Sequence, residues 1–327
     1  MKHISILVPE NAVLGSIEGP RQVFTEVNAF LESMGKAPVF KVQLVSEGNA
    51  VPVYNGIYQV SAVPLSAVSR TDLVIIPALD GDMAQNLERN KGFVPWIVQQ
   101  YKNGAEVASL CVGAFLLAAT GLLTGRSCAT HWMAANAFRE MFPDVNLLED
   151  KIITDENGLY SSGGAFSYLN LILHLVGKYT GRDVAVFCSK AFQIDIERQS
   201  QSPFIIFKGQ KAHADEQVKK AQEFIEQNFQ DKITVDELAG MLYLGRRNFE
   251  RRFKKATANT VVEYMQRVKV EAAKKSFETS RKSINEVMYD VGYADVKAFR
   301  TIFRKITGLT PIEYRNKYNR EAIALEA

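Results

Sequence analysis

The sequence predicts two domains: an α/β domain with helices on both faces of a mostly parallel sheet, and an all-α domain with two helix-turn-helix units. Its 327 residues are enough for two cores of ordinary size. Short β-branched runs alternate with helix-period segments in the first half, and the last third contains an internal repeat. The charge is also divided, because residues 1–210 carry a net −3 and residues 211–327 carry +6. Such a division is typical of an acidic module joined to one that binds a polyanion.

The strands of the α/β domain are predicted from four apolar runs that end in turn-forming or small residues. Helix-period segments such as PRQVFTEVNAFLES separate these runs, and the alternation favours a parallel sheet covered on both faces. A hairpin is predicted around Asn157 and Gly158, followed by a glycine-led turn into the apolar helix AFSYLNLILHLVGKY. The four runs are HISILVP (3–9), FKVQLVS (40–46), DLVIIPA (72–78) and EVASLCVGA (106–114).

The boundary between the domains is predicted near residue 210. Polar residues and Pro203 precede this point, and beyond it every segment has a period of 3.6 residues. We expect the first domain over residues 1–205, a linker over 206–213, the helical domain over 214–320 and a short tail over 321–327.

The helical domain contains a repeat with an offset of fifty residues. FERRFKKATANTVVEY (249–264) aligns with FRTIFRKITGLTPIEY (299–314), and the two phenylalanines, a lysine, two threonines and a Glu-Tyr pair coincide. Upstream, TVDELA (234–239) and SINEVM (283–288) both have the capping-box pattern that begins a helix. Each copy therefore predicts a helix, a turn and a second helix, with Gly245 and Gly292 expected to provide the tight backbone of the turns.

The second helix of each unit is predicted to carry basic side chains on its outward face. Phe249 and Phe253 are one helical turn apart, and Arg247 and Arg251 project about 160° away from that apolar stripe. In the second copy, Phe299, Ile302, Phe303 and Ile306 form the inward stripe. A basic helix face is often only solvated, but its recurrence at the same place in both units favours two helices that enter successive major grooves of DNA.

A cysteine after the fourth apolar run is the candidate nucleophile. Cys111 precedes an apolar helix, and Gly113 and Ala114 permit a sharp strand-to-helix turn of the nucleophile-elbow type. We expect the amides of the helix start to lower the pKa of the thiol and to hold an anionic group, with His131 as a candidate base. The alternative is that Cys111 is a packing residue.

Residues 214–320 resemble the AraC-type transcription activator domain, whose signature is visible in INEVMYDVGYADVKAFRTIFRKITGLTPIEYR (284–315). The first repeat departs from it, because Ala258 and Val261 replace the usual glycine and proline after the helix. We expect a cost of about 1 kcal/mol in turn stability and no displacement of the helix. The resemblance implies that bases are read by Arg246, Arg247, Glu250, Arg251, Val296, Lys297, Arg300 and Thr301, and the outward face adds Lys254 and Arg304.

Residues 1 to about 200 resemble the PfpI-type class I glutamine amidotransferase-like domain, which implies a flavodoxin-like sheet. The motifs are EGPRQVF (18–24), CVGAFLLAATGLLTGR (111–126), THW (130–132) and SSGGAFSYLNLILHLV (161–176). Joined to an AraC-type tail, this domain is similar to the GlxA-like group of regulators. Ser16 stands where family enzymes carry an orienting carboxylate, with Glu18 aimed differently, and Val112 replaces a histidine. We therefore assign no catalytic residue, keep Cys111 and His131 as the only candidates, and predict a ligand cleft lined by Cys111, Val112, Gly113, His131, Ser16 and Glu18.

The predicted function is a sequence-specific transcription regulator of the cytoplasm that binds double-stranded DNA, senses an unidentified small molecule and forms a homodimer. No apolar run reaches the ~18 residues of a membrane span, and the three cysteines do not form a metal-site pattern. We therefore expect no cofactor, metal or membrane partner. The alternatives are a cysteine-dependent hydrolase or glyoxal-processing enzyme fused to a DNA-binding domain, and a nucleoid-type structural binder.

Overall fold

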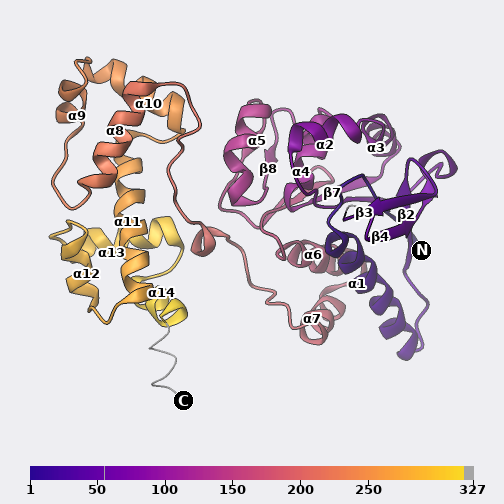
Figure 1. The fold of residues 1–327 in the computed structure, drawn as a ribbon. Coiled ribbons are helices and arrows are strands. Elements are labelled where there is room, and N and C mark those ends of the chain that lie inside the picture. Colours follow the sequence, from indigo (N-terminus) through magenta and orange to yellow (C-terminus); the bar gives the residue numbers. More distant parts are fainter. Residues whose placement is uncertain (55, 320–327) are drawn as a thin grey trace. The chain divides into compact units, whose positions relative to one another are not determined.

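The computed structural model describes residues 1–54 and 56–319, which divide into two compact units. The first unit is Met1–Gln201, and the second begins at Ser202. Figure 1 shows the first as strands and helices and the second as helices. The predicted tail, residues 321–327, lies outside the described residues.

The first unit is built on a seven-stranded sheet in the order β10-β11-β7-β6-β1-β2-β5. Its neighbouring strands are parallel except β10, which pairs antiparallel with β11 at one edge. The four predicted strands correspond to β1, β2, β6 and β7, and all four residues of β6 are buried, as expected for a central parallel strand. The strands are β1 Lys2–Leu7, β2 Phe40–Ser46, β3 Ala50–Val53, β4 Tyr58–Ser61, β5 Val63–Pro64, β6 Leu73–Ile76, β7 Glu106–Leu110, β8 Ser127–Cys128, β9 Asn146–Leu147, β10 Ile153–Glu156 and β11 Leu159–Ser162.

Helices cover both faces of this sheet, as predicted. Leu73 and Ile75 of β6 face a core shared with α1, α6 and α7, whereas Val74 and Ile76 face a core shared with α3, α4 and α5. This alternation follows from the two-residue period of a strand. The helices are α1 Leu14–Ser33, α2 Met83–Arg89, α3 Phe93–Lys102, α4 Ala114–Ala119, α5 Ala135–Met141, α6 Tyr168–Thr180 and α7 Arg182–Ala191.

The predicted hairpin is the β10–β11 pair. Asn157 and Gly158 occupy its turn with φ of 54° and 77°, the left-handed values that a tight hairpin turn requires. Beyond β11, Gly164 has φ of 83° in the turn that leads to α6. This arrangement places the outer strand of the sheet beside α6 and α7.

The second unit consists of helices, and two of its helix pairs are the predicted helix-turn-helix units. The first unit of this kind is α9–α10 and the second is α12–α13. The long helix α11 supplies Tyr264 to the first core and Phe277 to the second, so it connects the two (Figure 1). The helices are α8 Glu216–Gln227, α9 Val235–Met241, α10 Arg246–Thr257, α11 Val261–Thr279, α12 Ile284–Asp290, α13 Val296–Thr307 and α14 Pro311–Tyr318.

The sequence repeat is also a repeat of contacts. Thr257 and Thr307 each donate a 2.8 Å hydrogen bond to the carbonyl oxygen of the preceding phenylalanine, Phe253 or Phe303. The same phenylalanines pack edge-on against a tyrosine, with centroids 5.3 Å and 5.6 Å apart. Both predicted capping boxes are formed, at the starts of α9 and α12, and further ones begin α11 and α14. The two copies therefore share the threonine and phenylalanine contacts that hold their second helices.

The segment that enters the second unit packs against it. The Phe207 ring lies 5.1 Å from that of Tyr264, and the Gln222 side chain donates a 2.9 Å hydrogen bond to the Gln210 carbonyl oxygen. The buried Lys274 ammonium donates to the Ile205 carbonyl oxygen at 2.5 Å. Much of the segment predicted as a linker, 206–213, is therefore held by contacts within this unit. Among the described residues, no helix is both long and apolar enough to cross a membrane.

Candidate functional site

The second helices α10 and α13 present their basic side chains to solvent. Phe249, Phe253, Phe299 and Phe303 are fully buried and fix the orientation of both helices. The ten residues predicted to contact DNA lie away from this stripe. Eight are exposed and two, Glu250 and Val296, are half-buried; the exposed ones are Arg246, Arg247, Arg251, Lys254, Lys297, Arg300, Thr301 and Arg304.

The basic residues on these helices differ in their intramolecular partners. Arg246 forms ion pairs with Asp236 at 2.9 Å and Glu250 at 3.3 Å. Within the described part of the chain, Arg247, Lys297 and Arg300 have no hydrogen bond or ion pair to another side chain. Their charged groups can meet a phosphate or a base edge without first breaking a contact within the protein.

The aspartate that caps the start of α8 holds another arginine of α10. The Arg252 guanidinium forms two hydrogen bonds with the Asp215 carboxylate, at 2.8 Å and 2.7 Å, and its side chain is only 29% exposed. This pair lowers the pKa of Asp215, first through the hydrogen bonds from the guanidinium. Arg252 therefore fixes α10 on α8, and the basic stretch GRRNFERRFKK contains structural as well as outward-facing arginines.

The turn prediction was right for one unit and wrong for the other. Gly292 has φ of +75°, and a Cβ atom there would lie 2.1 Å from the Gln230 carbonyl oxygen. In the first unit the left-handed residue is Tyr243, with φ of 54°, whereas Gly245 has an ordinary φ of −67° and caps α10. The reason lies in the spacing of the repeat, because equivalent residues of the two copies are 49 positions apart before the turn and 50 positions apart after it. The residue that corresponds to Gly292 is therefore Tyr243 and not Gly245.

The predicted sharp turn at Cys111 is present in the first unit. Cys111 follows β7 directly, has φ of +54° and begins the short segment that leads into α4. Gly113 makes the turn possible, since a Cβ atom there would lie 2.4 Å from the Pro77 carbonyl oxygen. The Cys111 amide donates to the Ser162 hydroxyl at 3.3 Å, and its carbonyl oxygen accepts from the Thr130 hydroxyl at 3.1 Å. Neighbouring segments thus hold a strained backbone in place.

The electrostatics of Cys111 differ from the expectation. Burial raises the pKa of its thiol to about 11, although the Val112 amide acts in the opposite direction. The side chain is 6% exposed, so desolvation of a thiolate outweighs the helix-start amide. Burial also lowers the pKa of His131, whose Nδ1 accepts a hydrogen bond from the Met133 amide at 3.1 Å. No hydrogen bond joins Cys111 to His131 in the described part of the chain.

Ser16 and Glu18 both lie on helix α1. The Ser16 hydroxyl is buried, donates to the Val13 carbonyl oxygen at 2.7 Å and accepts from the Ala78 amide at 2.9 Å. Glu18 is exposed and pairs with Arg21 at 2.6 Å. Side chains two positions apart on a helix point in directions about 200° apart, so one of these side chains faces the protein and the other faces solvent. The carboxylate is therefore turned away from the position that Ser16 occupies.

Two features of the first unit were not found from the sequence. One is a cavity of about 790 Å³ beside α6, and the other is the buried side chain of Gln201, which bonds to the segment that contains His131. Both features depend on contacts between residues far apart in the chain, and no local sequence motif indicates them. No group of three or more His, Cys, Asp or Glu side chains among the described residues is arranged to hold a metal ion.

Comparison with known proteins identifies both parts of the chain. Residues 238–317 match a family of helix-turn-helix domains, and residues 26–178 match the DJ-1/PfpI family. The HTH-type transcriptional regulator GbdR of Pseudomonas aeruginosa is 27% identical over 68% of this chain, which spans 60% of that relative's length. The HTH-type transcriptional regulator GlxA of Rhizobium meliloti is 24% identical over 65% of this chain and 66% of its own length.

A solved structure shares the fold of the first unit. The crystal structure of an AraC family transcriptional regulator from Pseudomonas putida superposes with a TM-score of 0.51 at 17% identity, over 59% of this chain and 100% of that one. The chain thus joins a domain of the DJ-1/PfpI family to a helix-turn-helix domain of the AraC type.

Proposed function

We propose that this protein is a sequence-specific transcription regulator that binds double-stranded DNA through α10 and α13. The observation that carries the proposal is the exposure of Arg247, Lys297 and Arg300 on second helices that are held by identical phenylalanine pairs. An arginine fork can bond a guanine edge or a phosphate with two hydrogen bonds, and a lysine neutralises phosphate charge. The matches to curated HTH-type regulators support the same function.

The α/β unit is proposed to sense a small molecule and to form a homodimer in the cytoplasm. The groups predicted to form a ligand cleft at Cys111 include backbone amides, the half-buried His131 and the buried Ser16, and these groups suit binding better than catalysis. A thiol whose pKa is raised to about 11 is almost wholly protonated at neutral pH, and no base among the described residues is hydrogen-bonded to it. A cysteine-dependent enzyme remains the alternative, because the strained elbow is of the kind that nucleophiles occupy.

Ligand binding can act on DNA only through a difference in ligand affinity between two arrangements of the chain. We propose that the joint between the units lies close to Gln201 and Ser202, where the two compact units meet along the chain. The segment beyond it is held on the second unit by Phe207 and Lys274. Movement at this joint would reorient the DNA-binding unit as a single body.

Selection from a random DNA library, followed by affinity measurements on the selected and scrambled duplexes, tests the DNA-binding function. Arg247→Ala or Arg300→Ala should weaken binding to the selected duplex by about 1–3 kcal/mol and relax sequence preference. Lys254→Ala should weaken binding to the selected and the scrambled duplex by a similar factor. It should also reduce by about 1 the slope of log affinity against log salt concentration.

The matched control is Lys220→Ala, which removes an exposed charge from α8 and should change neither affinity. Equal binding of the unaltered protein to all sequences would instead indicate a nucleoid-type binder. Equal losses on every sequence for all three variants of α10 and α13 would remove the assignment of base-reading residues.

A further inference from the structure

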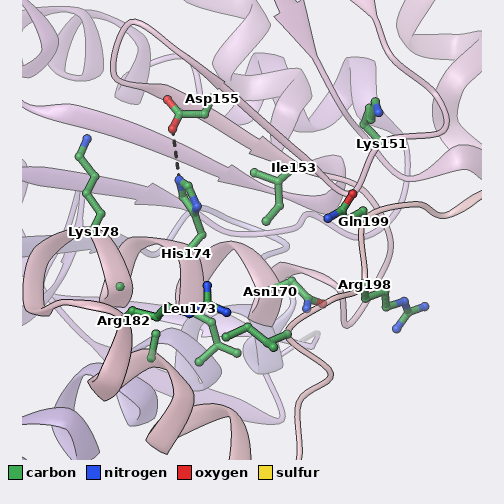
Figure 2. A pocket seen from close by; sticks show the side chains of 13 residues that line it. Lys151, Ile153, Asp155, Asn170, Leu173, His174, Lys178, Arg182, Arg198 and Gln199 are labelled. Atoms are coloured by element: carbon green, nitrogen blue, oxygen red, sulfur yellow. Dashed lines mark hydrogen bonds and ion pairs between the residues drawn. The ribbon is translucent and has the colours of Figure 1, made fainter.

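The first unit contains a cavity distinct from the Cys111 elbow. Its volume is about 790 Å³, which lies within the range of small-molecule sites. Strand β10, helix α6, the start of α7 and the segment 196–199 form its walls (Figure 2). Neither Cys111 nor His131 is among the residues that line it. Its ligand would therefore make contacts different from those of the elbow.

The charges around this cavity are mostly positive. Four cationic side chains, Lys151, Lys178, Arg182 and Arg198, line it together with one carboxylate, Asp155. Lys178 is compensated, because its ammonium donates to the Glu106 carboxylate and to the Tyr160 hydroxyl. Asp155 is also engaged, since His174 Nε2 lies 3.2 Å from its Oδ2 atom. Lys151 and Arg182 therefore leave positive charge at the cavity.

Arg182 is the residue best placed to bind an anion. Figure 2 shows its guanidinium turned toward the middle of the lining residues, whereas that of Arg198 turns outward. No hydrogen bond or ion pair joins Arg182 to another described side chain. A guanidinium can bond a carboxylate or a phosphate with two parallel hydrogen bonds, which a point charge cannot do.

The rest of the lining is suited to an apolar group. Ile153, Leu173, Ala185 and Ile196 contribute hydrocarbon surface between the polar residues. The Asn170 side chain is already committed, because it donates a 2.6 Å hydrogen bond to the Asp195 carbonyl oxygen. That bond fixes the start of the wall formed by residues 196–199. A ligand with an anionic end and a hydrocarbon body would match both parts of the cavity.

We propose that this cavity binds a small organic anion, with its carboxylate or phosphate on Arg182 and its apolar part against Ile196, which is 39% exposed. The wall formed by residues 196–199 leads within two residues to Gln201, the last residue of the first unit. Filling the cavity therefore constrains the segment that joins the sensor to the DNA-binding unit. The binding step stands by itself, and only this regulatory consequence rests on the proposed function.

Isothermal titration of the full chain with four probes tests the proposal. Hexanoate and hexyl phosphate carry the two anionic groups on the same hydrocarbon body, hexanol lacks the charge and inorganic phosphate lacks the body. We expect at least one of the two organic anions to bind with a Kd below ~10 mM, and hexanol and inorganic phosphate to bind more weakly. The stronger of the two anions identifies the group that the site prefers.

Variants of α7 locate the binding. Arg182→Gln should raise the Kd of the bound anion by about tenfold or more, Arg182→Lys should restore part of the affinity, and the exposed Lys190→Gln on the same helix should leave it unchanged. The proposal is wrong if neither organic anion binds, if hexanol binds equally well, or if Arg182→Gln binds like the unaltered chain. DNA affinity separates the two questions, because an unaltered chain that binds DNA normally but binds neither organic anion overturns only this inference.

Discussion

At the scale of single residues, glycine can be favoured at a left-handed backbone position for two reasons. A Cβ atom there can strain the backbone itself, or it can also collide with a neighbouring atom. Ala258 ends α10 with φ of 56°, and Gly308 ends α13 with φ of 74°. Both helices span twelve residues, so the missing glycine does not displace the end of α10, as the sequence predicted. Around Gly308, a Cβ atom would meet its nearest neighbours at ordinary contact distance, 3.9 Å. At Ala258 and Gly308, the cost of a Cβ atom therefore comes mainly from the left-handed backbone conformation and not from a collision with neighbours.

Replacement of Ala258 by glycine should stabilise the second unit. Ala258→Gly removes the unfavourable contact of a Cβ atom in a left-handed conformation, for an expected gain of about 1 kcal/mol, and Gly308→Ala should lose a similar amount. Gly292→Ala should lose more, because its Cβ would lie 2.1 Å from the Gln230 carbonyl oxygen. Urea unfolding followed by far-ultraviolet circular dichroism measures all three, while fluorescence of Trp96 and Trp132 reports the first unit alone. Equal losses for Gly308→Ala and Gly292→Ala would contradict the steric argument.

The reactivity of Cys111 should follow its burial. With a pKa of about 11, on the order of one thiol in 10,000 is ionised at pH 7, compared with a few per cent of an exposed cysteine. Because the thiolate is the nucleophile, the rate of alkylation by iodoacetamide should rise about tenfold per pH unit between pH 7 and 10 without a plateau. Mass spectrometry of the peptide that contains Cys111 measures this rate, with Cys111→Ser as the control. A plateau below pH 8 would show a lowered pKa and would favour the enzyme alternative.

At the scale of elements, the parts that the sequence could predict are those controlled by short-range period. The spacing of Phe249 and Phe253 fixed one face of α10, and the β-branched runs located β1, β2, β6 and β7, because both patterns record which side is buried. The short strands β3, β4, β5, β8 and β9 carried no such signal. They have two to four residues each, and their positions depend on neighbouring strands more than on their own sequence.

The candidate sites show a similar limit. Helix geometry indicated that Arg247 and Arg300 would be exposed, but it could not show that Arg246 is bound to Asp236 or that Arg252 is bound to Asp215. The two residues are ten positions apart in the first pair and 37 positions apart in the second. The pKa of Cys111 was mispredicted for the same reason, since the amount of protein that covers a thiol is a tertiary property. Local sequence specifies which groups an element carries, and packing decides which of them are free to act.

At the scale of the whole molecule, two hydrogen bonds connect the elbow to the end of the first unit. The Thr130 hydroxyl donates to the Cys111 carbonyl oxygen, and the Gln201 side chain donates to the Thr130 carbonyl oxygen at 2.9 Å. Gln201 is 1% exposed, and Gly163 makes room for it, since a Cβ atom there would lie 2.3 Å from the Gln201 amide nitrogen. Only Ser202 separates this anchor from Pro203, whose carbonyl oxygen accepts a hydrogen bond from Tyr318 in the second unit.

Removal of this anchor should loosen the joint without altering the DNA-binding helices. In Gln201→Ala, the carbonyl groups of Thr130 and Lys151 and the amide of Trp132 lose their bonds to the side chain, for an expected loss of about 2–4 kcal/mol from the first unit. Because the backbone of residues 199–201 pairs with residues 150–152, its release should also speed tryptic cleavage after Arg198 by about tenfold or more. Gln85→Ala, which alters an exposed glutamine on α2 away from the cleavage site and the cavity, is the matched control.

The affinity for DNA distinguishes an anchor from a general packing residue. Gln201 belongs to the first unit, so DNA binding by the variant should stay close to that of the unaltered protein, whereas any change in DNA affinity caused by a sensor ligand should be lost. Cleavage at the unaltered rate would show that the backbone pairing alone holds the segment. A ligand response that survives accelerated cleavage would show that coupling between the units does not pass through Gln201.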